Sequence, residues 1–116
     1  MAEQPKPSVY LVQFALAAGT EERAREGVYR QFEAANAELF GGERNVAMMG
    51  AAGLSIAIFG VSRLTAREIR DRYERKAALR PHNVLVVQIG SEVAEYHWNN
   101  LGSWLKRHTG SSSPLL

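Results

Sequence analysis

The side chains best suited to binding chemistry are the arginines and the lysine that recur between positions 63 and 80. Guanidinium and ammonium groups at such density can contact the phosphate oxygens of nucleic acid, which supply much of the affinity in those complexes. Pairs of opposite charge four residues apart, such as Arg67 with Asp71, equally suit a solvated helix face, and that interpretation stays open. The candidate contacts to nucleic acid are Arg63, Arg67, Arg70, Arg72, Lys76 and Arg80.

Catalytic side chains are sparse in this sequence. There is no cysteine, Asp71 is the only aspartate, and the three histidines at 82, 97 and 108 lack the spacing of metal ligands. Acid–base or metal chemistry needs carboxylates at strand ends or in a cleft, and the expected strands contain none in their cores. We therefore predict no catalytic residue, no metal site and no cofactor. A metal-independent ribonuclease that uses His82 or an arginine is a further alternative.

Four strands and two helices are expected around this basic stretch. Short runs rich in β-branched and aromatic residues predict the strands, and apolar residues that repeat at helical spacing predict the helices. Gly41 and Gly42 end the first helix, and a glycine-rich turn at 50–53 joins the middle strands. The expected strands are Ser8–Leu16, Asn45–Met49, Leu54–Val61 and Val84–Ile89.

The two helix starts are specified by local sequence. Thr20 is placed to cap the first helix with its side chain. Thr65 and Glu68 have the spacing of a capping box at the start of the second helix. The expected buried stripe of the second helix consists of Ile69, Tyr73 and Ala77.

The order strand, helix, strand, strand, helix, strand predicts an α+β fold. Two helices on one face of an antiparallel sheet make a ferredoxin-like βαββαβ two-layer sandwich, here with a C-terminal strand and short-helix appendage. At 116 residues the chain has room for one domain and one core. We expect that domain at 8–108, with a disordered N-terminus at 1–7 and a flexible tail at 109–116.

The strands predict self-association. Helices cover one face of the sheet in such a fold, and the other face should be polar in a monomer. Here the second face is also largely apolar, and it would expose more apolar surface than a soluble monomer usually tolerates. A homodimer formed through the sheets removes that surface, and the alternative is that the C-terminal segment folds back over it. The predicted dimer interface comprises Val9, Leu11, Gln13, Ala57, Phe59, Val84 and Val86.

Charge and hydropathy set further limits. The part up to Glu43 has four basic side chains against seven glutamates, whereas from Arg44 onward ten basic side chains oppose five acidic ones. A basic half of this kind can mark an anion-binding face. No apolar run approaches the roughly 18 residues of a spanning helix, and the N-terminus lacks the layout of a signal peptide. Together with the absence of cysteine, this predicts a cytoplasmic protein with no membrane partner.

Three motifs in the second half resemble a known family: Leu64–Arg72 (LTAREIRDR), Asn83–Gly90 (NVLVVQIG) and Gly102–Lys106 (GSWLK). Together they are similar to the SinR-type proteins, small relatives of the Cas-two protein of CRISPR adaptation. The resemblance implies a ferredoxin-like fold, a homodimer formed through the sheets and an association with DNA or RNA. Nuclease members of the family carry an aspartate at the end of the first strand. This chain has Gln13–Ala17 (QFALA) there, which argues against that activity.

The leading hypothesis is therefore a non-catalytic, Cas-two-like homodimer that associates with nucleic acid through the basic helix. The alternative is a dimeric protein-interaction module of the antitoxin or regulator type. Such a module would dock its partner through the apolar sheet face or the C-terminal helix. Affinity that falls steeply with salt would distinguish the first hypothesis, because phosphate contacts release counterions.

Overall fold

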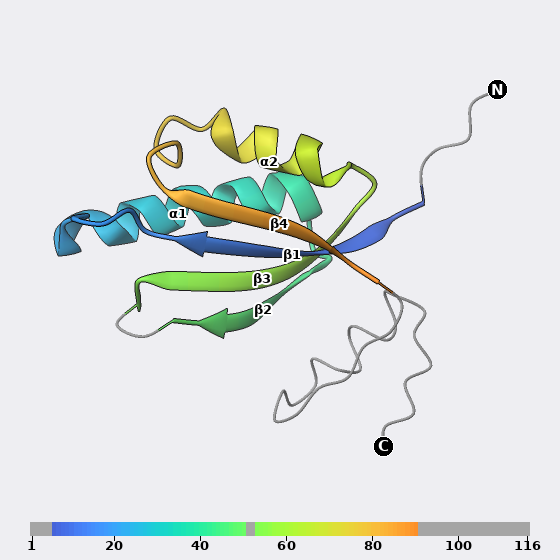
Figure 1. Ribbon diagram of the computed structural model, residues 1–116, viewed down its shortest axis with the longest axis horizontal. Helices are drawn as coiled ribbons and strands as arrows, with labels where there is room; N and C mark the ends of the chain where they lie inside the picture. The colour runs from blue at the N-terminus through green and yellow to red at the C-terminus, as the bar shows by residue number, and fades with distance from the viewer. Residues whose placement is uncertain (1–5, 51–52, 91–116) are drawn as a thin grey trace, which may run out of the picture.

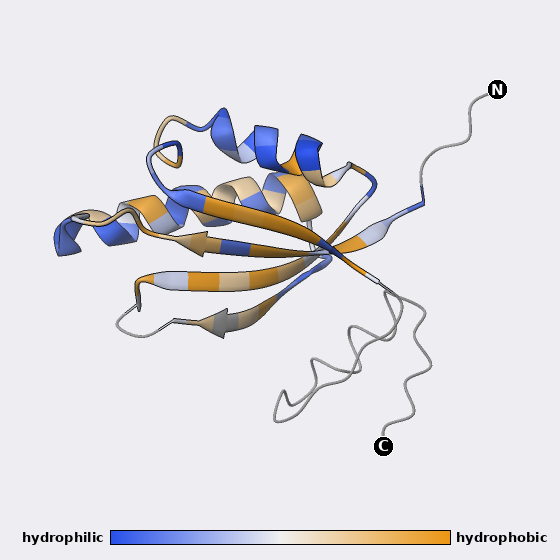
Figure 2. Ribbon diagram, in the orientation of Figure 1, coloured by the Kyte–Doolittle hydropathy of each residue, from blue (hydrophilic) through white to orange (hydrophobic). Residues whose placement is uncertain are grey.

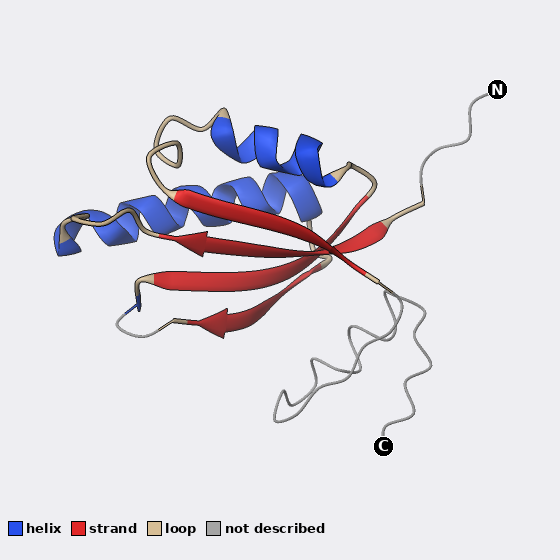
Figure 3. Ribbon diagram, viewed as in Figure 1, coloured by secondary structure: helices blue, strands red, loops and turns tan. Residues whose placement is uncertain are grey.

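The computed structural model describes residues 6–50 and 53–90. In this part of the chain the four expected strands and two expected helices are all present, in the predicted order (Figures 1 and 3). The elements are β1 (Ser8–Ala15), α1 (Glu22–Phe40), β2 (Arg44–Met49), β3 (Ser55–Ser62), α2 (Ala66–Glu74) and β4 (Asn83–Ile89).

The strands form one antiparallel sheet in the order β2-β3-β1-β4. β1 is paired along both edges, with β3 on one side and β4 on the other. Each helix therefore joins two strands that are separated in the sheet by one other strand. β3 lies between β1 and β2, and β1 lies between β3 and β4. The predicted α+β class with an antiparallel sheet and two helices is confirmed.

α1 begins at Glu22 and ends at a glycine. The predicted cap by Thr20 is wrong, because Glu21 occupies the cap position without a side-chain hydrogen bond. The Thr20 hydroxyl donates instead to the carbonyl oxygen of Ala17 at 2.7 Å, and so stabilises the turn after β1. The predicted helix end at Gly41 is confirmed. This residue has a φ of 59°, a conformation that glycine adopts without the steric cost of a Cβ atom.

α2 has the capping box that its sequence predicts. The Thr65 hydroxyl accepts a hydrogen bond from the backbone N–H of Glu68 at 3.1 Å, and the Glu68 carboxylate accepts one from the Thr65 N–H at 3.0 Å. These bonds satisfy two N–H groups at the helix start. The helix is shorter than the predicted stripe and ends at Glu74. Ala77 is consequently exposed, and Leu79 is buried in the core instead.

Both helices pack on one face of the sheet around a stack of buried aromatic rings. The ring centroid of Phe14 in β1 lies 4.5 Å from that of Phe32 in α1, and Phe32 lies 5.5 Å from Tyr73 in α2. The end of α1 approaches β3 at Gly60, where an added Cβ atom would come within 2.5 Å of the Phe40 ring. A glycine in β3 therefore allows this helix end to lie directly on the sheet.

One polar pair is buried between the two helices. The Tyr73 hydroxyl donates to Asn36 Oδ1 at 2.5 Å, and both side chains are buried. Within the described residues Asn36 Nδ2 has no hydrogen-bond partner. Burial raises the pKa of the Tyr73 hydroxyl well above its ordinary value, and the charge of Glu33 adds to the effect. The hydroxyl therefore stays protonated and keeps the two helices in a fixed relation.

The other face of the sheet is largely apolar and is not covered by either helix. The prediction that Val84 and Val86 belong to this open face is wrong. Pairing with β1 turns both valines toward the helices, where they pack against the core. A shift of one residue in a strand moves every side chain to the opposite face. Leu85, Val87 and Ile89 therefore occupy the open face, with Leu85 54% and Val87 40% exposed.

The remaining residues of the predicted interface lie on the open face in neighbouring strands. Register pairs Leu11 with Phe59 and Gln13 with Ala57, on the side opposite to the core residues of β1. Val9 is buried there by apolar side chains from the other three strands of the sheet, whereas Gln13 is exposed. A second copy of the chain on this face stays a prediction.

Several predictions concern residues that lie outside the described ranges. These are the C-terminal strand and short helix, the tail at 109–116, most of the N-terminal segment and the histidines at 97 and 108. Of the helices that the structure describes, neither has the length and apolar character needed to cross a membrane.

Tyr73→Phe tests the buried pair. The variant leaves Asn36 Oδ1 without its donor in the core, and we expect urea denaturation at neutral pH to show a loss of about 1–3 kcal/mol in unfolding free energy.

The raised pKa of Tyr73 adds a second effect, on the pH dependence of stability. Above about pH 10 the unfolded chain loses the Tyr73 proton while the folded chain keeps it, so wild-type stability falls with rising pH. Tyr73→Phe has no hydroxyl to titrate, so this contribution to the fall in unfolding free energy at alkaline pH is absent in the variant.

The control for Tyr73→Phe is the double variant with Asn36→Leu, which removes both polar partners. It should be more stable than Tyr73→Phe alone, because no buried polar group is then left unpaired. If the difference in unfolding free energy between wild type and Tyr73→Phe stays constant from about pH 8 to about pH 11, the raised pKa is wrong.

Candidate nucleic-acid interface

The basic side chains predicted to contact nucleic acid lie on α2 and on the segments that flank it. Between Arg63 and Arg80 there are seven basic and three acidic residues, a formal surplus of four positive charges. α2 directs most of them outward because Ile69 and Tyr73 face the core. Figure 2 shows this helix mostly in hydrophilic colours. The structure divides the cations between two sides of the helix.

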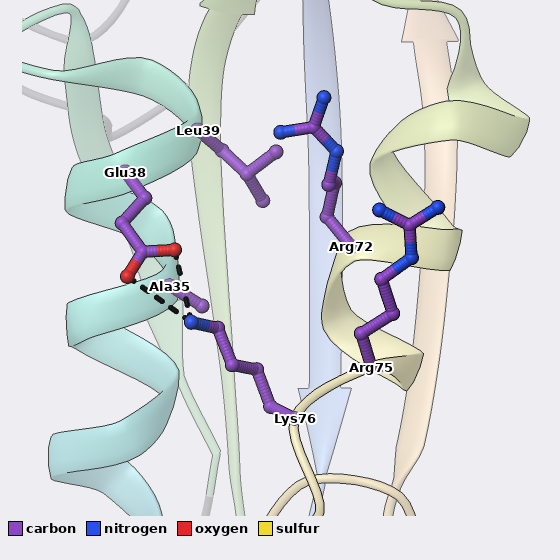
Figure 4. A pocket seen from close by; sticks show the side chains of 6 residues that line it. All are labelled: Ala35, Glu38, Leu39, Arg72, Arg75 and Lys76. Carbon is purple, nitrogen blue, oxygen red and sulfur yellow. Dashed lines mark hydrogen bonds and ion pairs between the residues drawn. The ribbon is translucent and has the colours of Figure 1, made fainter.

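The first side of α2 faces α1 and forms the helix groove, a hollow of about 180 Å³ (Figure 4). Lys76 reaches across it to the Glu38 carboxylate, with Nζ 3.0 Å and 3.1 Å from the two oxygens. Within the described chain, Arg72 and Arg75 have no side-chain ion pair or hydrogen bond, so their charges are available to an anion. The groove is lined by Ala35, Glu38, Leu39, Arg72, Arg75 and Lys76.

The second side of α2 faces β4 and forms the edge hollow, of about 290 Å³. Arg70 makes an ion pair of 2.7 Å with the neighbouring Asp71, and this hydrogen bond raises the pKa of Arg70. The predicted pair of Arg67 with Asp71 is therefore wrong, and Arg67 has no ion pair with any residue that the structure describes. The edge hollow is lined by Ala66, Arg67, Arg70, Val84, Leu85 and Val86.

Two other predicted cations lie at the ends of the basic stretch and are already engaged. Arg63 lies in the turn before α2 and interacts with a neighbouring group. Arg80 follows α2, and its Nε donates to the carbonyl oxygen of Glu74 at 3.2 Å. The predicted set is thus divided between the helix groove, the edge hollow and these two ends.

Arg75 is absent from the predicted set, because Asp71 four residues earlier offers it a partner. In the structure Asp71 binds Arg70, and Arg75 lines the helix groove. Its spacing of three residues from Arg72 was the available signal, since such residues share a side of a helix. The contribution of Glu38 had no signal in the sequence, because it depends on how α1 packs against α2.

His82 fixes the loop before β4 to the end of β1. Its Nδ1 accepts a hydrogen bond from the backbone N–H of Ala17 at 2.9 Å, and its ring centroid lies 5.7 Å from that of Phe14. An accepting Nδ1 means that the neutral ring carries its proton on Nε2. One ring nitrogen is therefore committed to the backbone, which gives His82 a structural role.

Three glutamates of the acidic half are paired with arginines. Three ion pairs on and beside α1 join Arg23 to Glu21, Arg30 to Glu26 and Arg44 to Glu33, at 2.8, 2.6 and 2.5 Å. In residues 6–50 and 53–90 no three histidine, aspartate or glutamate side chains gather where they could hold a metal ion. On and at the end of α2, the arginines that have no ion pair with a described residue are Arg67, Arg72 and Arg75, and they line the two hollows beside this helix.

Comparison of the chain with protein-family models, with curated proteins and with solved structures gives no match. The SinR-type resemblance therefore rests on the three sequence motifs alone. Two of these motifs have a structural explanation: LTAREIRDR contains the capping box and most of α2, and NVLVVQIG contains β4. They specify local structure and do not specify a ligand.

The geometry predicts the tautomer of His82. At about pH 8, ¹⁵N NMR should find the proton of the neutral ring on Nε2, because Nδ1 accepts from Ala17. His82→Ala removes this acceptor and should lower the unfolding free energy by about 1–2 kcal/mol in urea denaturation. A proton on Nδ1, or an unchanged unfolding free energy, would show that this hydrogen bond is absent.

Proposed function

We propose that this chain is a non-catalytic, Cas-two-like module that binds nucleic acid as a homodimer and has a ferredoxin-like fold. The strand order, in which each helix spans an intervening strand, supports the ferredoxin-like arrangement. The SinR-type motifs support the same fold and an association with DNA or RNA. With the absence of cysteine, they also support action in the cytoplasm, in the setting of CRISPR adaptation or of a toxin–antitoxin pair.

The observation that carries the proposal is the pair of arginines in the helix groove. Arg72 and Arg75 lie on the same side of α2, and no described side chain neutralises them. Guanidinium groups present several donors in a fixed plane and bind phosphate oxygens well. Lys76 adds a third cation, which it shares with Glu38. Such a groove suits the phosphate backbone, but it offers no contacts that distinguish one base from another. Binding should therefore be weak and independent of sequence.

The open face of the sheet supports self-association. Leu85 and Val87 lie beside Gln13 and Leu11, and Phe59 continues the row on β3. Stacking this face on that of a second copy would remove apolar surface from water, at roughly 25 cal/mol for each Å² buried. The helices lie on the far side of each sheet, so such a dimer presents two helix grooves on its outer faces. Two grooves on one particle would strengthen binding to a long nucleic acid.

Two observations support binding over hydrolysis. β1 ends in Phe14-Ala15 without the aspartate of the family's nuclease members. His82, the remaining candidate for acid–base chemistry, has one ring nitrogen bound to the Ala17 N–H. The proposed role therefore depends on charge and shape and not on turnover.

Nucleic-acid binding should depend on the helix groove and on salt. We expect wild type to bind labelled DNA or RNA of about 20 nucleotides at about 50 mM salt, and to lose at least about tenfold in affinity at about 200 mM, because bound counterions are released. Arg72→Glu combined with Arg75→Glu should abolish binding at the lower salt. Fluorescence anisotropy measures both effects.

The matched control is Arg23→Glu combined with Arg30→Glu, which changes the net charge equally on the exposed surface of α1. It should retain most of the wild-type affinity. An equal loss in the two double variants would mean that net charge and not the groove attracts the nucleic acid. Wild type that ignores both DNA and RNA at the lower salt would refute the proposal.

Leu85→Glu should convert the dimer into a monomer. The change places a charge on the open face, in the outer strand β4, and desolvating it in a dimer interface is costly. Light scattering measures the mass, and circular dichroism checks that the fold persists. Gln88→Glu is the matched control, because Gln88 is exposed on the opposite face of the same strand. A wild-type monomer, or a dimer that survives Leu85→Glu, would exclude this interface.

A further inference from the structure

The two outer strands of the described sheet differ in how their backbone edges are protected. β2 has a register shift between Val46 and Met48, and it begins with Arg44, which binds Glu33 and the carbonyl oxygen of Gly41. Bulges and charged side chains are devices that prevent another strand from pairing with an edge. β4 has neither: its sequence NVLVVQI contains no charge and no proline, and it pairs with β1 without a register shift.

Positively charged side chains of α2 lie beside the unprotected β4 edge. Figure 1 shows α2 running alongside β4, and the edge hollow lies between them. Arg67 and Arg70 line this hollow together with the apolar side chains of β4. Toward the start of β4, a second hollow of about 190 Å³ adds Arg80 and His82 to its lining. Leu85 and Val87 are exposed on the other side of the same strand.

We propose that the β4 edge binds an extended acidic segment of a partner protein, which adds a strand to the sheet. Backbone N–H and C=O groups of β4 pair with the segment, whose alternate side chains point to opposite faces. On the helix side they meet Arg67 and Arg70, which favours aspartate or glutamate. On the open side they lie beside Leu85 and Val87, which favours aliphatic residues. The fitting segment therefore alternates acidic and apolar residues over the length of β4.

Other occupants fit this edge less well. Antiparallel pairing of two β4 strands around a two-fold axis would bring Arg67 and Arg70 of both copies together, and like charges repel. Nucleic acid has the complementary charge but no row of N–H and C=O groups to match a strand edge. It also offers no aliphatic side chains to Leu85 and Val87. An acidic peptide complements both the charge and the edge.

This inference goes beyond nucleic-acid binding and does not depend on it, because it uses the opposite side of α2. The test uses the full chain and a seven-residue peptide with blocked ends that alternates glutamate and valine. At about 150 mM salt, where long-range attraction is screened, addition of the peptide should shift the amide NMR signals of β4. Arg67→Glu combined with Arg70→Glu should weaken binding at least about tenfold, and should instead favour a peptide that alternates lysine and valine.

Two controls separate strand addition from simple charge attraction. Arg72→Glu combined with Arg75→Glu makes the same charge change on the other side of α2, and it should leave peptide binding within about twofold of wild type. A fully N-methylated peptide keeps its side chains and charges but cannot donate hydrogen bonds to β4, and it should not bind. Equal binding of the N-methylated peptide would overturn the inference.

Three further outcomes would also overturn it. The first is no binding of the alternating peptide at millimolar concentration. The second is strong protection of the outward β4 amides from hydrogen exchange in the free protein, because the edge would then already be covered by a second copy or by the rest of the chain. The third is an oligonucleotide, and not the peptide, that shifts the β4 signals. Loss of nucleic-acid binding in the groove variants would leave this inference untouched.

Discussion

The pairing of β1 along both of its edges is the constraint on which the rest of this structure depends. It places Phe14 where Phe32 of α1 can stack on it, with Tyr73 of α2 stacked in turn on Phe32, and it sets which side chains of β3 and β4 face the helices. β1 also positions the segment before α2, because the Tyr10 hydroxyl donates to the carbonyl oxygen of Leu64 at 2.6 Å. Because β1 is largely apolar on both faces, its central position leaves one face of the sheet covered by the helices and the other face open.

The sequence predicted best where the signal was local. The capping box at Thr65 and the glycine at the end of α1 depend on a few adjacent residues, and both are present as expected. The inward and outward faces of β4 could not be predicted, because Val84 to Val87 are all apolar and an alternating pattern is lacking. Only the register against β1, a contact between distant parts of the chain, decides between the two faces.

The same limit applies to the candidate site. Sequence spacing predicted a basic helix, but it could not show that Asp71 would bind its neighbour Arg70 and leave Arg75 in the helix groove. Sequence spacing also could not show that Glu38 would form an ion pair with Lys76, since this pair joins two helices that are far apart in sequence. α2 thus contributes arginines to two separate surfaces. The ligand proposed for each surface is anionic, but the two surfaces select it by different features. The groove offers isolated guanidinium groups, whereas the edge hollow combines them with an apolar strand.

Gly60 shows how narrow the tolerance for change can be at a position without a side chain. The Phe40 ring occupies the space that any Cβ atom at residue 60 would need, and this contact seats the end of α1 on β3. Most strand positions accept a range of apolar residues if volume is conserved. A side chain at residue 60 instead requires either a smaller residue at 40 or a shift of this buried ring. The packing of α1 on β3 therefore restricts which residues can stand at position 60, although Gly60 itself carries no charge and makes no side-chain hydrogen bond.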